Sequence, residues 1–227
     1  MNPLGSDNAY YLDTGWVSSD STIELPNSSS IWIADKNTIG VNEPVKLTWT
    51  SDQNITFEKI ITLDENYLFS VDQRVINNSG LSFDLYPYGL SKRQGIPEMQ
   101  NFFILHEGPL SITDGVLEEY DYDDLKDDKK IKHSSVGGWI GMTDKYWQTA
   151  IIPNQNEPVQ QTYSYSFVDN IDNFQTDIVG ERIAVSNNAS ISHNFKIFAG
   201  PKIVNIIDKY MEEYGFDGFD RSVDFGW

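Results

Sequence analysis

Apolar side chains recur at every second residue along much of this chain, and that spacing is typical of β-strands with one buried face. Val45, Leu47 and Trp49 show it, each separated from the next by a polar residue. Residues 77–80, Asn-Asn-Ser-Gly, lie between two such segments and predict the turn of a β-hairpin. Because helical spacing is almost absent before residue 200, we expect an all-β fold of antiparallel sheets packed as a sandwich.

The chain is long and apolar enough to build one such sandwich. It has 227 residues, of which 39% are hydrophobic, and a single all-β domain reaches about 200–250 residues. We therefore expect two parts: a β-sandwich domain over residues 1–200 and a C-terminal helical segment over residues 201–227.

Helical spacing begins at the start of the second part. Ile203, Ile207 and Tyr210 share one face of a predicted helix, Pro201 suits its first turn, and Gly215 suits its C-terminal end. Beyond that glycine, large aromatic residues alternate with charged ones up to the last residue. A folded monomer normally buries so much aromatic area, so we expect the chain to be part of a longer protein.

The charge balance excludes several classes of function. With 34 acidic and 16 basic residues, the formal net charge is -18, and such a surface repels nucleic acid and anionic lipid headgroups. Contact with a membrane would therefore require a local apolar element. Because the chain has no cysteine, it offers no thiolate nucleophile, disulfide or zinc-thiolate site. We expect neither a cofactor nor a metal.

Residues 118–132 form a charged run with seven acidic and four basic side chains, which predicts a solvated loop. Asp121, Asp123 and Asp124 invite comparison with a calcium-binding loop. That loop requires a glycine where Lys126 stands, and its final glutamate is missing. We therefore expect no calcium site here.

Three stretches resemble, in order, the periplasmic region of the YidC-type membrane protein insertases of Gram-negative bacteria. The first is residues 137–153, with Gly-Gly-Trp at its start, a Tyr-Trp pair and a closing proline. The second is residues 198–202, Phe-Ala-Gly-Pro-Lys, which resembles the junction between the last strand and the C-terminal helix. The third is residues 219–227, which in the family precede the second transmembrane helix.

This resemblance implies a β-supersandwich like that of galactose mutarotases, with one or two short C-terminal α-helices. It also implies a non-catalytic domain on the periplasmic face of the inner membrane that serves docking and positioning. Its implied partners are the accessory proteins SecD and SecF, nascent membrane proteins and the transmembrane core of the parent insertase. Family members usually begin with further strands, so we expect the first strands to be absent and part of the core to be unfilled.

Two groups of side chains are candidates for these contacts. The tail after Gly215 resembles an interfacial aromatic belt that would couple the domain to the membrane, although it could simply pack on the sandwich. Flat rings near residue 140 could contact a substrate in a cleft, although core packing is their commoner role. The coupling candidates are Phe216, Phe219, Asp220, Arg221, Asp224, Phe225 and Trp227, and the cleft candidates are Trp139, Tyr146 and Trp147.

A periplasmic carbohydrate-binding or mutarotase-like protein of the same fold is the alternative, because sugar epimerisation uses a general acid and a general base. His106 and Glu107 are adjacent, but neighbouring residues of a strand point to opposite faces. His193 shares a face with Ile191 and is expected in the core, and His133 is expected to face solvent. We therefore predict no catalytic residue.

Overall fold

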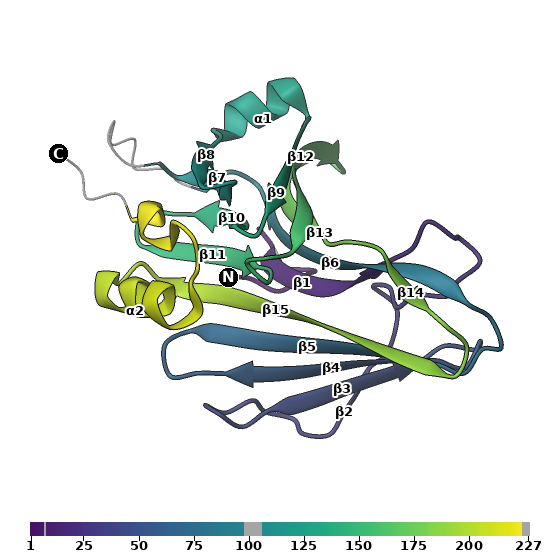
Figure 1. Ribbon diagram of the computed structural model, residues 1–227. Coiled ribbons are helices and arrows are strands. Elements are labelled where there is room, and N and C mark those ends of the chain that lie inside the picture. The colour runs from purple at the N-terminus through teal and green to yellow at the C-terminus, as the bar shows by residue number, and fades with distance from the viewer. Residues whose placement is uncertain (7, 98–105, 224–227) are drawn as a thin grey trace.

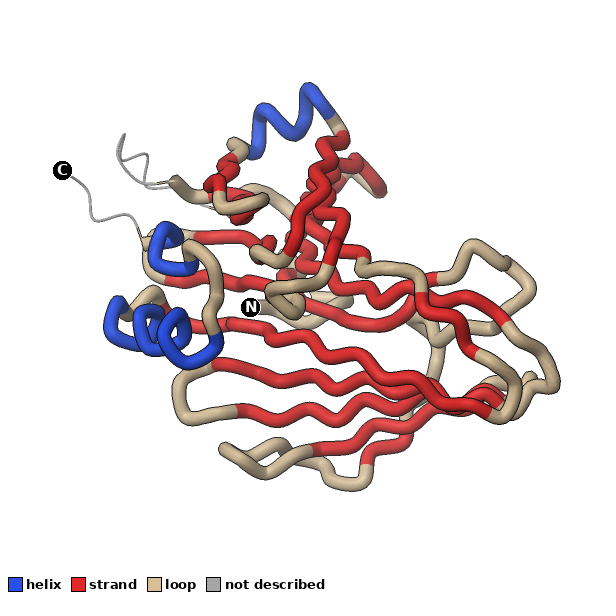
Figure 2. Tube along the Cα trace, viewed as in Figure 1, coloured by secondary structure: helices blue, strands red, loops and turns tan. Residues whose placement is uncertain are grey.

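The computed structural model describes residues 1–6, 8–97 and 106–223, and in this part of the chain two antiparallel sheets dominate (Figures 1 and 2). The prediction of an all-β sandwich is confirmed. The larger sheet contains, in spatial order, β2 (Ile33–Ala34), β3 (Val45–Thr50), β4 (Ile55–Leu63), β5 (Leu68–Asn77), β15 (Ala189–Pro201), β11 (Trp147–Ile152), β10 (Trp139–Thr143), β7 (Gly108–Thr113) and β8 (Val116–Glu119).

The smaller sheet lies against one face of the larger one. It contains, in spatial order, β1 (Tyr10–Val17), β6 (Phe83–Gln94), β13 (Ile171–Val179), β12 (Pro158–Val168) and β9 (Lys130–Val136), and β14 (Ile183–Val185) also pairs with β6. The helices are α1 (Tyr122–Asp128), α2 (Val204–Tyr214) and the short 3-10 helix η1 (Phe219–Ser222).

Half of the larger sheet is buried on both faces. On the face toward the smaller sheet, Ile140 and Ile151 pack with Tyr163 and Phe174. On the opposite face, which we call the outer face, α2 and η1 cover β10, β11 and β15. Burial on two sides explains why β7 and β10 consist entirely of buried residues and lack an alternating pattern.

The hairpin predicted at residues 77–80 is wrong. The strand before this turn, β5, pairs with β4 and β15 in the larger sheet, whereas the strand after it, β6, pairs with β1, β13 and β14 in the smaller sheet. The turn therefore carries the chain from one sheet to the other. The connection from β14 to β15 does the same.

One buried side chain holds both crossovers together. Asn77 is fully buried, and its Nδ2 donates to the carbonyl oxygens of Leu81 at 2.7 Å, Val185 at 3.3 Å and Ser186 at 3.1 Å. Its own carbonyl oxygen accepts a bond from the Asn188 amide at 2.8 Å. These bonds satisfy main-chain groups that leave the sheet ladders at the crossovers.

The charged run 118–132 is also not a loop. It contains the end of β8, the helix α1 and the start of β9. Tyr122 and Leu125, three residues apart, turn one face of α1 into the core, and both are buried. The charged residues between them face outward, which is why charge density alone suggested a loop.

The C-terminal helix ends as predicted but begins later. Gly215 has φ of 68° and closes α2 through a bond from its amide to the Met211 carbonyl oxygen. Pro201, however, is the last residue of β15, and the helix begins only at Val204. Among the described residues, no helix is both long enough and apolar enough to cross a membrane.

The crossover bonds of Asn77 lead to a testable prediction. Replacing it by alanine leaves three carbonyl oxygens without their donor, so we expect Asn77→Ala to lower the free energy of unfolding by about 2 to 3 kcal/mol. Urea denaturation measures this. The matched control is Asn78→Ala, because Asn78 is its exposed neighbour, and we expect a change within about 0.5 kcal/mol. Equal effects of the two substitutions would contradict the role given to Asn77.

Candidate functional site

The three stretches that carry the family resemblance meet in one aromatic cluster on the outer face. Trp139 comes from β10, Phe198 from β15 and Phe219 from η1, and all three are fully buried. The ring of Phe219 meets those of Trp139 and Phe198 edge to face, with centroids 5.4 Å apart in each case. The motifs therefore share a packing role.

This cluster corrects the prediction that the first part of the tail forms an interfacial belt. Phe216 and Phe219 point into the core and have no exposed face for a membrane. Two glycines with positive φ, Gly215 and Gly218, let the chain turn twice and bring these rings onto the sheet. Gly218 has φ of 56°, and an added Cβ would lie 2.9 Å from Cδ1 of Ile112, so the backbone conformation and the close approach together favour glycine.

Three hydrogen bonds hold the C-terminal segment against the sandwich, and their donors lie in α2, β10 and η1. The Tyr210 hydroxyl donates to Asp64 Oδ2 at 2.6 Å, and the Trp139 indole donates to the main-chain oxygen of residue 217 at 3.1 Å. Arg221 Nη1 donates to the Gly115 carbonyl oxygen at 2.6 Å. These bonds, together with the aromatic cluster, hold α2 and η1 against the sandwich.

The other tail candidates are exposed or lie outside the described residues. Asp220 and Arg221 are both exposed. The predictions for Asp224, Phe225 and Trp227 concern residues outside those that the structure describes. The coupling hypothesis therefore rests on the residues after the aromatic cluster.

The three cleft candidates differ in exposure. Trp139 is fully buried, so it cannot stack on a substrate. Trp147 is half-buried and meets Tyr67 edge to face at 6.3 Å. Tyr146 is 70% exposed, with Lys145 Nζ 4.9 Å from its ring centre. Of the three, Tyr146 offers the largest open ring to a partner.

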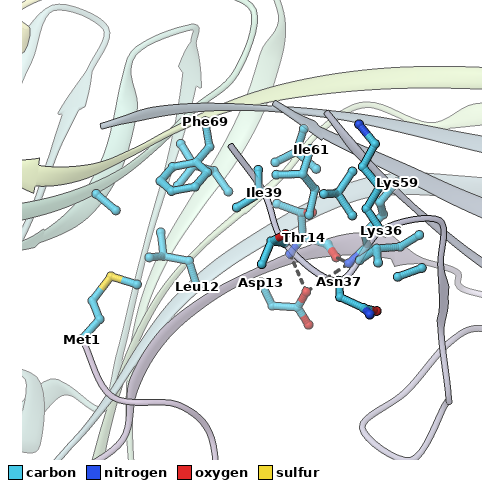
Figure 3. A pocket seen from close by; sticks show the side chains of 17 residues that line it. Met1, Leu12, Asp13, Thr14, Lys36, Asn37, Ile39, Lys59, Ile61 and Phe69 are labelled. Atoms are coloured by element: carbon cyan, nitrogen blue, oxygen red, sulfur yellow. Dashed lines mark hydrogen bonds and ion pairs between the residues drawn. The ribbon is translucent and has the colours of Figure 1, made fainter. Parts of the chain in front are cut away.

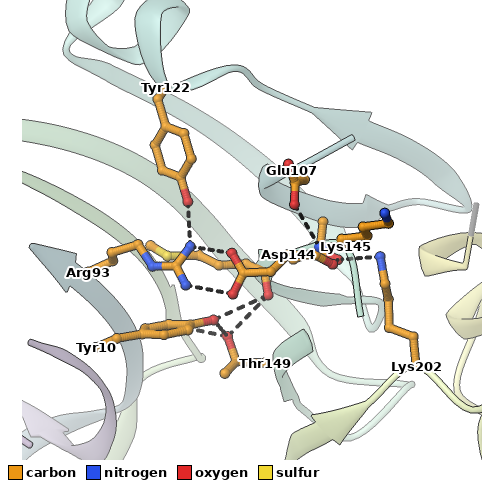
Figure 4. Close-up of polar contacts among 11 residues, drawn as sticks. Tyr10, Arg93, Glu107, Tyr122, Asp144, Lys145, Thr149 and Lys202 are labelled. Carbon is orange, nitrogen blue, oxygen red and sulfur yellow. Dashed lines mark hydrogen bonds and ion pairs between the residues drawn. The ribbon is translucent and has the colours of Figure 1, made fainter. Parts of the chain in front are cut away.

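A partly buried ion pair joins the two sheets beside these residues (Figure 4). Arg93 of β6 binds Asp144 with both terminal nitrogens, at 2.6 and 2.7 Å, and also donates to the Tyr122 hydroxyl at 2.8 Å. The guanidinium lies 4.0 Å from the ring centre of Tyr10. It thereby links the smaller sheet, the turn after β10 and helix α1.

The phenols in this network remain protonated. Burial raises the pKa of Tyr10 far above its usual range, against the opposing effect of Arg93. Burial likewise raises the pKa of Tyr122, again opposed by Arg93. The cluster therefore offers neutral hydroxyls and a fully paired carboxylate. This chemistry suits structural cross-linking of the sheets and supplies no general base.

The histidines do not converge on one place. His106 Nε2 lies 3.1 Å from the Pro109 carbonyl oxygen. His133 Nε2 lies 2.9 Å from the Tyr120 hydroxyl. Its side chain, which was expected to face solvent, is half-buried. His106 is not on a strand, since β7 begins at Gly108.

One pair was not predicted. His193 Nε2 lies 2.9 Å from Glu157 Oε2, and the His193 side chain is 9% exposed. The two residues are 36 positions apart, and no local pattern links them. They line a hollow of about 510 Å³ together with Asn154 and Tyr214. This is the arrangement on which the carbohydrate alternative depends. Within the described residues, no three acidic or histidine side chains lie close enough to hold a metal ion.

Comparison with known proteins agrees with the sequence resemblance. A family model described as the YidC periplasmic domain matches residues 1–227. Proteins named membrane protein insertase YidC from Rickettsia canadensis (strain McKiel) and Rickettsia bellii (strain OSU 85-389) are 38% and 37% identical over 228 residues. These matches cover 100% of this chain and 41% of each relative. The chain thus spans about two fifths of the length of these relatives.

A solved structure supports the fold class alone. A galactose mutarotase related enzyme from Lactobacillus acidophilus superposes with a TM-score of 0.54 at 11% identity, covering 74% of this chain and 70% of that one. The expected mutarotase-like sandwich is therefore confirmed. Because the family model and the relatives both match over its full length, this chain belongs to the YidC periplasmic domain family.

Proposed function

We propose that this chain is the non-catalytic docking and positioning domain of a membrane protein insertase, on the periplasmic face of the inner membrane. The relatives that match its full length are named for membrane protein insertion. The observation that carries the proposal is the fixed C-terminal segment, which Tyr210, Trp139 and Arg221 bind to the sandwich. A segment held in this way transmits the orientation of the domain to whatever follows it.

In this proposal, residues 201–227 couple the sandwich of residues 1–200 to the membrane, and α2 and η1 of this segment share a buried cluster with the larger sheet. The first part of the segment, α2 and η1, holds it on the sandwich, and its last residues, Asp220, Arg221, Asp224, Phe225 and Trp227, meet the membrane or the transmembrane core. The open ring of Tyr146 is a candidate contact for a nascent membrane protein. SecD and SecF are the proposed partners at the sandwich surface, and a crosslinking map of the full-length insertase would locate them.

The carbohydrate-binding alternative rests on a single observation, the half-buried His193–Glu157 pair beside a hollow on the surface. A histidine and a carboxylate at this distance could exchange a proton with a bound sugar hydroxyl. The same pair also joins β15 to the loop before β12, and ring contacts with Trp16 and Phe195 hold the imidazole in place. A structural role accounts for every one of these contacts.

The coupling proposal predicts that the end of the tail affects insertion without affecting the fold. In the full-length insertase, we expect the double substitution Phe225→Ser and Trp227→Ser to reduce insertion several-fold in a depletion-complementation assay. The thermal midpoint of the isolated domain should not change. The matched control is Phe167→Ser, which removes a 60% exposed ring elsewhere. Full complementation by the double variant would refute the proposal.

The packing of α2 and η1 on the sandwich predicts the opposite pattern at Phe219, which is a loss of stability of the isolated domain. Truncation of this buried ring to alanine should lower the free energy of unfolding by about 3 to 5 kcal/mol, as large-to-small changes in a core do. Urea denaturation of the isolated domain measures the change. Asp220→Ala, at the exposed neighbouring position, serves as the control and should stay within about 0.5 kcal/mol. A small effect of Phe219→Ala would show that the aromatic cluster does not hold the tail.

The carbohydrate alternative predicts saturable binding of galactose or glucose at millimolar concentration. We expect none when tryptophan fluorescence is followed during titration. Trp16 lies 6.2 Å from the His193 ring, so it would report a sugar in the neighbouring hollow. Saturable binding that is lost in Glu157→Gln and retained in Glu181→Gln, an exposed control, would reverse the ranking of the two functions.

A further inference from the structure

Gln155, in the loop 153–157 between β11 and β12, uses every hydrogen-bonding position of its side-chain amide. Its Oε1 accepts from the amides of Gly138 at 3.3 Å and Asp217 at 3.2 Å. Its Nε2 donates to the carbonyl oxygens of Gly138 and Pro153, both at 3.0 Å. A glutamine amide has two acceptor and two donor positions. This half-buried side chain therefore joins its own loop, the turn before β10 and the C-terminal segment.

The turn before β10 can lie against this loop because it consists of two glycines. Gly137 and Gly138 have φ of 66° and 72°. A Cβ added at Gly137 would collide with the main chain of Gln155, and one added at Gly138 would collide with the main chain of Ile112. The Gly-Gly pair that opens the first stretch of family resemblance therefore brings this main chain within reach of the Gln155 side chain.

The main chain of Asp217 belongs to the short connection between α2 and η1. Gly215 and Gly218, on either side of it, both have positive φ, and glycine gives a main chain more conformational freedom than any other residue. The Asp217 amide donates to Gln155, and its carbonyl oxygen accepts from the Trp139 indole at 3.1 Å. The connection is thus held by both of its polar groups at the point where glycines give it the most freedom.

The loop that carries Gln155 is itself anchored to the larger sheet. Two residues further along, the Glu157 carbonyl oxygen accepts from the Gly137 amide at 2.9 Å. The Glu157 carboxylate lies 2.9 Å from His193 Nε2 on β15. Loop 153–157 therefore rests on β15 and on the turn before β10, and Gln155 holds the C-terminal segment from a base that is fixed to the sandwich.

We propose that Gln155 is the positioning residue of the C-terminal segment, whose amide locks the glycine-flanked connection at Asp217 and so holds η1 in one place on the sandwich. The burial of Phe219 also attaches η1, but the hydrophobic effect is non-directional. Hydrogen bonds require defined distances and angles, so the amide selects one placement among those that apolar packing allows. This inference rests on the proposed function, because it concerns the segment that would couple the domain to the membrane.

Hydrogen exchange of the 227-residue chain, followed by NMR, tests the proposal. Gln155→Met keeps the length of the side chain and removes all of its hydrogen bonds. We expect the Asp217 amide to exchange roughly tenfold faster, as the loss of one hydrogen bond implies. Amides at the centre of β5 should keep their rates. The matched control is Asn156→Ala, which changes an exposed side chain of the same loop and should leave both rates unchanged.

A distance measurement separates positioning from stability. Because the chain has no cysteine, spin labels can be attached at Asp220→Cys in η1 and Ser192→Cys in β15, both at exposed positions. We expect one narrow distribution of distances between the labels in the parent chain and in Asn156→Ala, and a broader one in Gln155→Met. A residue that only stabilised the fold would lower the thermal midpoint and leave the distribution narrow.

Three results would overturn the proposal. They are an unchanged exchange rate at Asp217 in Gln155→Met, an equal rise in β5, which would show a loss of global stability alone, or an unchanged distance distribution. In the full-length insertase, Gln155→Met should also reduce insertion several-fold in the depletion-complementation assay. Full complementation despite faster exchange at Asp217 would support the positioning role of Gln155 and contradict the proposed function, so the two failures can be told apart.

Discussion

The pairing of β15 with two neighbours is the constraint on which the rest of the structure depends. Residues 189–198 pair with β5 and residues 196–201 pair with β11, so this strand joins the two halves of the larger sheet. Its side chains serve both faces: Phe195 packs toward the smaller sheet and Phe198 toward the helices. Because α2 follows the strand after only two residues, the position of β15 also sets the position of the C-terminal segment.

Burial on two sides gives the family motifs a physical meaning. Trp139, Phe198 and Phe219 are far apart in the sequence but share one cluster on the outer face. A change at any of them would loosen the segment that leads out of the domain. The likeness to a galactose mutarotase related structure shows the fold class, and in this chain the helices α2 and η1 cover part of the outer face of the larger sheet.

The sequence was sufficient for the fold class and not for the connections. Alternation predicts strands because it depends only on neighbouring residues. The turn residues 77–80, by contrast, suit a hairpin and a crossover between sheets equally well, and long-range pairing decides between them. Helix α1 was hidden because only Tyr122 and Leu125 face the core. The direction of Phe219, and the partnership of Glu157 with His193, also depend on contacts that no local pattern contains.

The unequal size of the two sheets leaves apolar side chains of the larger one uncovered by the smaller one. Within the described residues, the larger sheet has nine strands and the smaller one six, so part of the inner face of the larger sheet lies beyond the smaller sheet. The alternation that gives β3, β4 and β5 a buried face continues beyond the edge of the smaller sheet, with Leu47, Ile61 and Phe69 still pointing inward (Figure 3). Apolar area of this size is normally covered in a folded protein, because its exposure to water is unfavourable.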